Sequence, residues 1–157
     1  EFEITHTGYS KINENKIERN LKMLADELIN EPDNDFVKFH LASTYFAKGD
    51  IDQAGLIFHS IINSFQLSAE QLDMLYIRLS QIYLRKDDYD KVSEYAKRIP
   101  TDKNLQGLRN YILSSVKLEK NELREAYNLM TDKDTLKSSL IDKEILNKTI
   151  ESLRKIM

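Results

Sequence analysis

Cysteine is absent from the 157 residues of this chain, which excludes disulfide bonds, thiol catalysis and zinc–thiolate sites. This absence is compatible with a reducing compartment, and we expect a cytoplasmic protein. The four glycines form no loop that could cradle a phosphate. No apolar run approaches the roughly 20 residues that a membrane-crossing helix needs, so we expect no membrane span.

Side chains for hydrolytic chemistry are also scarce. The chain has three histidines and no Gly-x-Ser-x-Gly turn, which leaves little material for a catalytic triad. His40 and His59 each stand beside an expected core residue, so we expect both on a surface or in a groove rather than at a metal. The chain itself is therefore expected to be without catalytic activity.

The charges are mixed along the whole sequence. The net charge of −3 comes from 23 basic and 26 acidic side chains. No basic face emerges from them, so nucleic acid is not an expected partner. With 41% hydrophobic and 31% charged residues, the chain is long enough to bury one continuous core and has too little charge of one sign to be disordered.

A pattern of small residues recurs three times. In each repeat, a small residue is followed twelve positions later by a second one. The pairs are Ala42 with Ala54, Ser80 with Val92, and Ser114 with Ala126. Seven positions after the first member comes a turn-forming residue, which is Gly49, Asp87 or Asn121. The repeat period is thus 38 and then 34 residues, which is typical of helical solenoids.

Close packing explains these residue types. Two antiparallel helices joined by a tight turn approach closely only where their crossing carries small side chains. Val92 adds bulk at the second crossing, so that pair is expected to lie slightly wider apart. Gly and Asn tolerate the left-handed backbone of a turn, and Asp caps the amides of the helix that follows. The turn dipeptides are Gly49-Asp50, Asp87-Asp88 and Asn121-Glu122.

The apolar spacing predicts helices along most of the chain. One helix is expected at about 14–30, and a last one near 138–156 serves as the cap that a solenoid needs at its end. Between them we expect three helix pairs, at 35–48 with 51–65, at 69–86 with 88–98, and at 105–119 with 122–130. The segment 131–139, rich in Ser, Thr and Asp, is expected to be the longest connection.

The repeats resemble the tetratricopeptide repeat family, whose pattern places Leu, a small residue, an aromatic, Gly, Ala and Phe at set offsets. The first repeat, LASTYFAKGDIDQAGLIF from Leu41 to Phe58, matches each of these positions. The second has Ala96 in place of Phe, and the third has Lys117 where the aromatic belongs. Pro32 stands where the family closes a preceding repeat, so the helix before it resembles the second half of a partial repeat.

We therefore predict an all-α fold. Residues 13–157 are expected to form a tetratricopeptide-type helical solenoid, with about three helix pairs, an N-terminal half-repeat helix and a C-terminal capping helix. Residues 1–12 are expected to be a short extended segment, because the first nine alternate in the manner of a strand.

The N-terminal fifty residues carry a second resemblance. Several unlike residue types stand there at fixed spacing, namely His6, Gly8, Tyr9, Lys16, Arg19, Asn20 and Pro32. This arrangement is similar to the junction in bacterial family 2 glycosyltransferases that carry tetratricopeptide repeats behind their catalytic domain.

The second resemblance implies a parent enzyme that transfers a sugar from a nucleotide sugar. Residues 1–12 would then be the tail end of a missing catalytic domain. A divalent metal (Mn or Mg) and the nucleotide sugar are implied for that parent, and no cofactor for this chain. The resemblance allows His6 a place near the metal, but without the partner carboxylates the simpler interpretation is that His6 ends a strand. The acidic run Asp33-Asn34-Asp35 is expected to cap the first repeat helix instead.

In the tetratricopeptide family, the first helix of each pair lines a groove that receives a partner. The corresponding positions here are apolar and aromatic for the most part. They are Phe36, Phe39, Ser43, Phe46, Met74, Ile77, Gln81, Leu84, Leu108, Tyr111 and Ser115. Family members that grip a chaperone's C-terminal carboxylate carry Lys, Asn and Arg at such places, which argues against that function. The strip is either a recognition surface or core covered by a neighbouring helix.

Two functions remain open at this stage. The first is a non-catalytic repeat domain of a glycosyltransferase, which binds the acceptor, packs on the catalytic domain or self-associates as a homodimer. The second is a free-standing cytoplasmic adaptor that binds a protein or peptide. Repeats of this kind serve many unrelated functions, so the repeats alone do not decide between the two.

Overall fold

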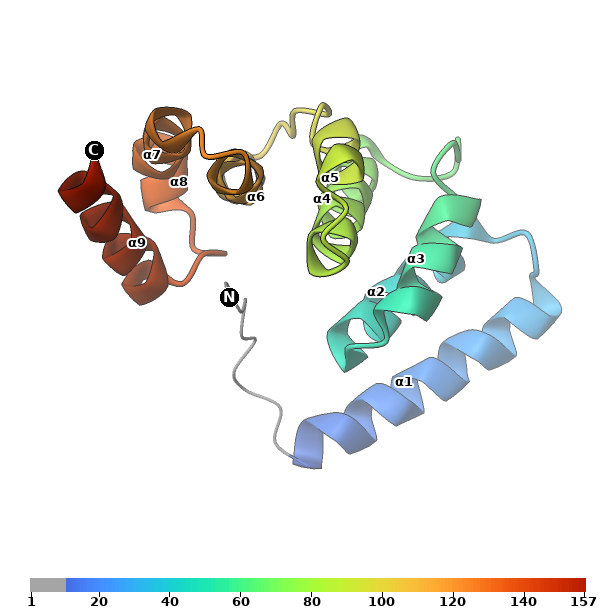
Figure 1. Cartoon of the computed structure of the whole chain (residues 1–157). Helices are drawn as coiled ribbons and strands as arrows, with labels where there is room; N and C mark the ends of the chain where they lie inside the picture. The colour runs from blue at the N-terminus through green and yellow to red at the C-terminus, as the bar shows by residue number, and fades with distance from the viewer. Residues whose placement is uncertain (1–10) are drawn as a thin grey trace. The chain divides into compact units, whose positions relative to one another are not determined.

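The computed structural model describes the backbone of residues 11–157 and the side chains from Glu14 onward. The predicted extended segment and the candidate metal ligand His6 therefore lie outside the described residues, except that residues 11 and 12 already belong to a helix. All regular structure in the described part is helical (Figure 1), which confirms the all-α prediction. None of these helices is both long and apolar enough to cross a membrane.

The chain divides into two compact units, residues 1–67 and 68–157. The first unit contains α1 (Lys11–Asn30), α2 (Asp35–Lys48) and α3 (Ile51–Ser60). Helix α1 packs along α2, and Leu21 and Leu24 of α1 share a buried cluster with Val37 and Leu41 of α2. The unit is thus a hairpin of α2 and α3, with α1 packed against α2.

The start of α2 is fixed by local hydrogen bonds. Asn34 is the N-cap, and its Oδ1 accepts from the Val37 N–H at 3.1 Å, which confirms the predicted capping role of this segment. The backbone N–H of Asp35 donates to Gln66 Oε1 at 3.0 Å. A hydrogen bond from the Ser64 side chain lowers the pKa of the Asp35 carboxyl. The segment after α3 is therefore held against the beginning of α2.

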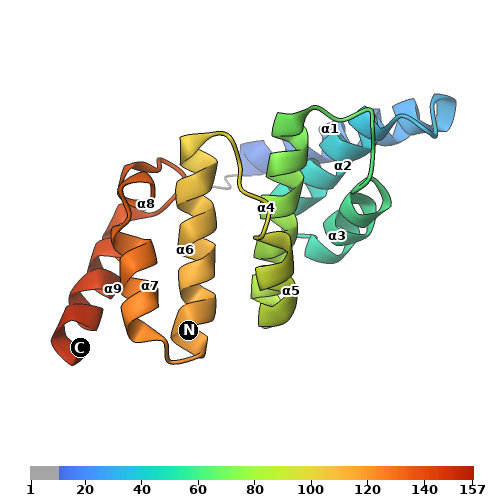
Figure 2. The same cartoon turned by 90° about the horizontal axis from the view of Figure 1, so that it is seen from above.

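The second unit contains the remaining helices, which are α4 (Ala69–Arg85), α5 (Tyr89–Tyr95), α6 (Lys103–Glu119), α7 (Leu123–Thr131), α8 (Lys133–Lys137) and α9 (Lys143–Ile156). Helices α4 and α5 form one hairpin and α6 and α7 the next, and α6 packs against both members of the first (Figure 2). One hydrophobic cluster includes Ile77 of α4, Ile112 of α6 and Leu153 of α9. Helix α9 thus contributes to the core of the unit, as expected of a terminal helix.

The predicted helix crossings are fully buried. The side chains at all six positions are 0% exposed: Ala42, Ala54, Ser80, Val92, Ser114 and Ala126. The members of each pair come from helices that pack on each other, α2 on α3, α4 on α5, and α6 on α7. The six residues predicted at the helix crossings are therefore buried, and they belong to helices that pack on each other in pairs.

The turns inside the three hairpins share one backbone conformation. Left-handed φ angles occur at Gly49 (92°), Asp87 (55°) and Asn121 (58°). Asp50 and Asp88 then cap the next helix by accepting from the N–H groups of Gln53 and Lys91, each at 3.2 Å. Glu122 stands at the same place in the third hairpin but makes no capping hydrogen bond.

Lys117, the residue that departs from the repeat pattern, forms ion pairs across the third hairpin. Its ammonium group contacts the carboxylates of Glu122 and Glu125, and hydrogen bonding to Glu122 raises the pKa of Lys117. In the second hairpin, Tyr83 occupies the corresponding position, and the Lys91 ammonium lies 4.6 Å from the centre of its ring. The two hairpins are thus closed by different kinds of interaction at the same place.

The segment 131–139 was wrongly predicted as a connection, because it contains α8, and α9 begins at 143 rather than 138. The buried Thr135 donates its hydroxyl to the Leu129 carbonyl at 2.8 Å. Lys143 Nζ donates to the carbonyl of Leu136 at 2.8 Å. Polar side chains therefore link this short helix to α7 and to the start of α9, and an apolar pattern does not reveal it.

Two helices end earlier than predicted, α3 at Ser60 instead of 65 and α5 at Tyr95 instead of 98. Proline limits how far α5 could extend. Pro100 has no N–H to donate to the carbonyl of Ala96, four residues before it, and it disfavours a helical residue at the preceding position. Arg109 of α6 takes that role, since its Nε donates to the Ala96 carbonyl at 2.5 Å.

Helices α6 and α8 approach each other closely at Gly107. A Cβ atom at this position would lie 2.2 Å from the carbonyl oxygen of Asp134 and 2.8 Å from Cβ of Ser138. Ser138 in turn donates its hydroxyl to the Asn104 carbonyl at 2.9 Å. A glycine is therefore required at position 107, because α8 occupies the space that any side chain there would fill.

The connection between α5 and α6 is held to α4 by a buried carboxylate. Asp73 is 3% exposed, and it accepts from Arg98 Nε at 2.6 Å and from the Thr101 N–H at 3.0 Å. The Arg98 guanidinium also lies 5.3 Å from the ring centre of Tyr76. Both partners of Asp73 belong to residues 96–102, so this carboxylate fixes the path between the two hairpins.

The burial of Ala54 leads to a first prediction. Ala54→Leu is expected to lower the free energy of unfolding by roughly 1–3 kcal/mol, because the added atoms overpack the crossing of α2 and α3. Urea denaturation measures this change. Ala25→Leu is the matched control, since Ala25 is exposed in the middle of α1. A loss for Ala54→Leu no larger than that of the control would contradict the packing described here.

Candidate functional site

Most of the predicted groove residues of the second unit lie in its hydrophobic core. Ile77, Leu108 and Tyr111 are buried members of the central cluster, and Met74 and Leu84 pack against it. Burial raises the pKa of the Tyr111 hydroxyl. These five side chains therefore lie between packed helices. Of the two alternatives that the sequence left open, they are core covered by a neighbouring helix and not a recognition surface.

The two polar members of the predicted strip in this unit are also covered to different degrees. Gln81 is 5% exposed and its Oε1 accepts from Arg78 at 2.9 Å. Ser115 is half-buried. Neither side chain adds to an open apolar surface.

The predicted strip on the first unit is split. Phe39 and Phe46 are buried at 7% and 5% exposure, and the Phe39 ring packs edge-on against Phe58 with centroids 6.0 Å apart. Phe36 is 51% exposed, and Ser43 is half-buried. Phe36 and Ser43 are thus the members of this set that a partner could reach.

The two described histidines lie at surface depressions. His40 is on α2, with its ring 4.4 Å from Phe36 and 5.6 Å from Phe39. His59 is on α3 beside the segment that follows that helix. Among residues 14–157, no three His, Asp or Glu side chains gather in a way that could hold a metal ion. The candidate metal ligand His6 lies outside this range.

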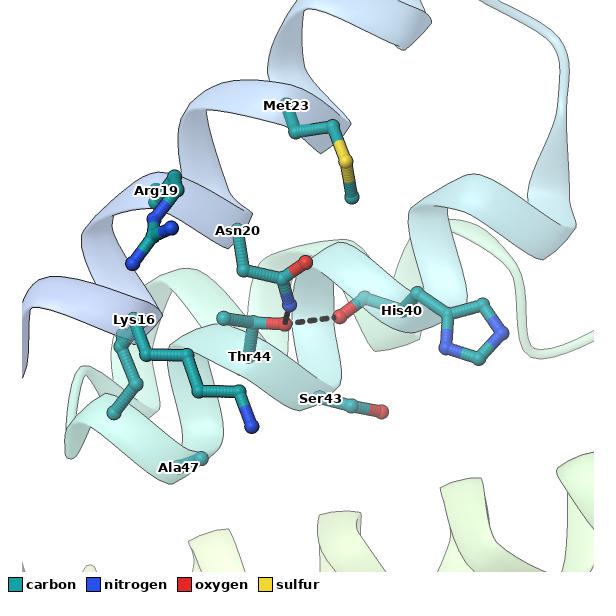
Figure 3. Close-up of a pocket in the computed structure, with 9 residues that line it drawn as sticks. Lys16, Arg19, Asn20, Met23, His40, Ser43, Thr44 and Ala47 are labelled. Carbon is teal, nitrogen blue, oxygen red and sulfur yellow. Dashed lines mark hydrogen bonds between the residues drawn. The ribbon is translucent and has the colours of Figure 1, made fainter. Parts of the chain in front are cut away.

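A groove with a volume of about 650 Å³ lies between α1 and α2 (Figure 3). We call it the α1–α2 groove. Helix α1 contributes Lys16, Ile17, Arg19, Asn20 and Met23, and α2 contributes His40, Ser43, Thr44 and Ala47. These residues belong to one unit, so the groove is a property of that unit alone.

The middle of the α1–α2 groove is polar. Asn20 Nδ2 donates to the Thr44 hydroxyl at 3.1 Å, and that hydroxyl donates to the His40 carbonyl at 2.8 Å. Ser43 donates its hydroxyl to the Phe39 carbonyl at 2.8 Å. The hydrogen bond between Asn20 and Thr44 links the two walls and fixes the orientation of the Asn20 amide.

One end of the α1–α2 groove is cationic. Lys16 and Arg19 are exposed side chains on neighbouring turns of α1, and none of the described residues that line the groove carries a carboxylate. Within the described part of the chain, neither cation has a carboxylate within 4 Å. The nearby Glu18 is paired instead with Lys48, at 2.7 Å, and this hydrogen bond raises the pKa of Lys48. The positive charge at this end is therefore available to a ligand.

The other end of the α1–α2 groove is apolar and aromatic. Met23 is 57% exposed, and its side chain extends from α1 toward α2 (Figure 3). His40 faces this end from α2, and the exposed Phe36 lies against the His40 ring. Exposed large apolar side chains that meet at a depression are typical of a surface that receives a partner.

The sequence did not single out the α1 wall of this groove. Lys16, Arg19 and Asn20 were part of the resemblance to glycosyltransferases but were not predicted to line a groove. Met23 was not predicted to have a functional role. Their spacing of three and four residues places them on one stripe of α1, beside the apolar stripe that packs on α2. This stripe was a usable signal, because it combines two cations with an exposed methionine.

Comparison of the chain with protein-family models, curated proteins and solved structures finds no match.

Proposed function

We propose that this chain is a non-catalytic, tetratricopeptide-type repeat module that binds a peptide segment of a protein partner in the α1–α2 groove. The observation that carries the proposal is the groove itself, which has a volume of about 650 Å³ and combines an apolar end, a polar centre and two exposed cations. Such a mixture suits a peptide, since it offers both desolvation and hydrogen bonding. The small-residue hairpins support the assignment to this repeat type.

A more specific version of the proposal concerns the parent protein. We propose that the module serves a family 2 glycosyltransferase in the cytoplasm and binds its acceptor, because Lys16, Arg19 and Asn20 carry that resemblance and also line the groove. The alternative, a free-standing adaptor, would use the same groove for a different protein.

Peptide selection on the full chain tests the proposed function. A displayed library of random short peptides is selected for binding, and the enriched peptides are then measured by calorimetry. Ala47→Trp fills the groove from α2 and is expected to weaken these peptides by at least about tenfold. Ala25→Trp, an exposed position of α1 outside the groove, is the matched control and should leave affinity unchanged.

Two outcomes would contradict the proposed function. The first is a selection that enriches no peptide with micromolar or tighter affinity. The second is a set of enriched peptides that bind Ala47→Trp as well as they bind the wild type, which would place their site elsewhere.

A further inference from the structure

We infer that the α1–α2 groove recognises an extended acidic segment, with a carboxylate at the Lys16 and Arg19 end and an apolar side chain at the Met23 end. This inference rests on the proposed function, since it names the class of peptide that the same groove takes. The expected ligand is a protein segment that lies along α1, with its acidic and apolar residues in a fixed direction.

The charge of the groove selects the carboxylate. The described lining contains Lys16 and Arg19 and no carboxylate, so it is cationic although the whole chain has a net charge of −3. The closest acidic residue on α1, Glu18, is engaged by Lys48 at 2.7 Å. An acidic ligand therefore meets two cations that have no carboxylate partner among residues 14–157. Arg19 can bind a carboxylate through two parallel hydrogen bonds.

The Asn20 amide favours an extended main chain. Its Nδ2 is occupied by the Thr44 hydroxyl, which turns Oδ1 away from Thr44. Among the described residues, Oδ1 receives no hydrogen bond. The N–H groups of an extended peptide are free to donate to Oδ1, whereas those inside a helix are already bonded to its own carbonyls.

The length of the groove sets the spacing of the two anchors. Lys16 and Met23 are seven residues apart on α1, which corresponds to about 10 Å along a helix. An extended chain in the polyproline II conformation covers about 9 Å in three residues, and its side chains return to the same side every third residue. The expected segment therefore has an acidic residue and a large apolar residue separated by about three positions.

Fluorescence anisotropy with defined peptides on the full chain tests this inference. The first probe is a short labelled peptide that carries Glu and Leu at the expected spacing. The second replaces Glu by Gln, and the third places Glu next to Leu. We expect the first probe to bind at least about tenfold more tightly than either of the others. Its affinity should also fall as salt rises above about 0.15 M, where exposed charges are screened.

Charge reversal locates the contact. Arg19→Glu is expected to weaken the acidic probe by about tenfold or more. Lys22→Glu is the matched control, because Lys22 is exposed on α1, lies outside the groove lining and gives the same change in net charge. Circular dichroism confirms that both variants are folded. Equal effects of the two substitutions would overturn the inference, since a general field would then explain the binding.

The inference and the proposed function fail in different ways. If selected peptides lose affinity for Ala47→Trp but bind Arg19→Glu normally, the groove binds peptides and the acidic preference is overturned. If Ala47→Trp affects no peptide, the proposed function itself is wrong and the inference with it. A single-stranded oligonucleotide that binds as tightly as the acidic probe would overturn the choice of a protein partner. Sedimentation that finds a dimer abolished by Ala47→Trp would assign the groove to a second copy of this chain.

Discussion

Gly107→Ala is expected to lower the free energy of unfolding by about 2–4 kcal/mol, although Ala is the better helix former by about 1 kcal/mol. The added Cβ would lie 2.2 Å from a backbone oxygen of α8. A backbone atom cannot move aside as a flexible side chain can, so α8 must shift away from α6. Urea denaturation measures the loss.

Hydrogen exchange shows where the loss arises. In Gly107→Ala, the amides of α8 should lose protection first, since Ser138 can no longer donate to the Asn104 carbonyl at its present distance of 2.9 Å. Amides of the first unit, residues 1–67, should keep the protection of the wild type. A stabilised Gly107→Ala variant would show that α8 does not lie against α6 at this point.

Arg98→Met is expected to lower the free energy of unfolding by about 2–3 kcal/mol. The substitution keeps much of the apolar length of the side chain. It leaves the Asp73 carboxylate, which is 3% exposed, with the hydrogen bond from the Thr101 N–H but without its ion pair. The expected loss is below that of a fully enclosed ion pair, because the Arg98 side chain is 34% exposed and water can enter in its place.

A double-mutant cycle separates the ion pair from simple packing. Asp73→Leu combined with Arg98→Met should be more stable than Arg98→Met alone, because the double variant buries no unpaired charge. Arg124→Met is the control, since Arg124 is exposed on α7, and it should change stability by less than about 0.5 kcal/mol. Additive effects of the two substitutions would show that Asp73 and Arg98 do not interact.

The hairpins could be predicted from the sequence because small residues and turn residues have few alternative uses. Ala42 and Ala54 lie twelve residues apart because one helix half, a two-residue turn and another helix half separate them. Gly49 and Asn121 mark the turn because they adopt positive φ angles with little strain. Local chemistry and tertiary packing favour the same structure at these positions, so the hairpins can be predicted from the sequence alone.

The C-terminal part was harder to predict because its order depends on contacts between distant residues. Segment 131–139 is rich in polar residues, yet Thr135 and Ser138 are buried with their hydroxyls bonded to backbone carbonyls. Nothing in the local sequence shows that Gly107, about thirty residues earlier, leaves space for this segment. Tertiary contacts override composition here.

The residues predicted to line a groove also show that sequence periodicity does not determine which side chains are covered. Phe39 and Phe36 are three residues apart on one helix, and periodicity assigned both to the same face. The structure buries one and leaves the other 51% exposed, because helices of finite width cover only part of a stripe. The α1 wall could not be located by periodicity alone, since a cavity depends on how two helices lie against each other.

The ion pairs of Lys117 bear on how hairpins of this kind could be exchanged or redesigned. Tyr83 and Lys91 become Lys117 and Glu125 thirty-four residues later, so both members of the contact differ in chemical type while the contact remains. Replacing Lys117 alone with tyrosine would set the Glu125 carboxylate against the electron-rich face of a ring, which repels it. A consensus sequence built by averaging the repeats position by position would thus lose this contact. Transferring a whole hairpin would keep both of the residues that form it.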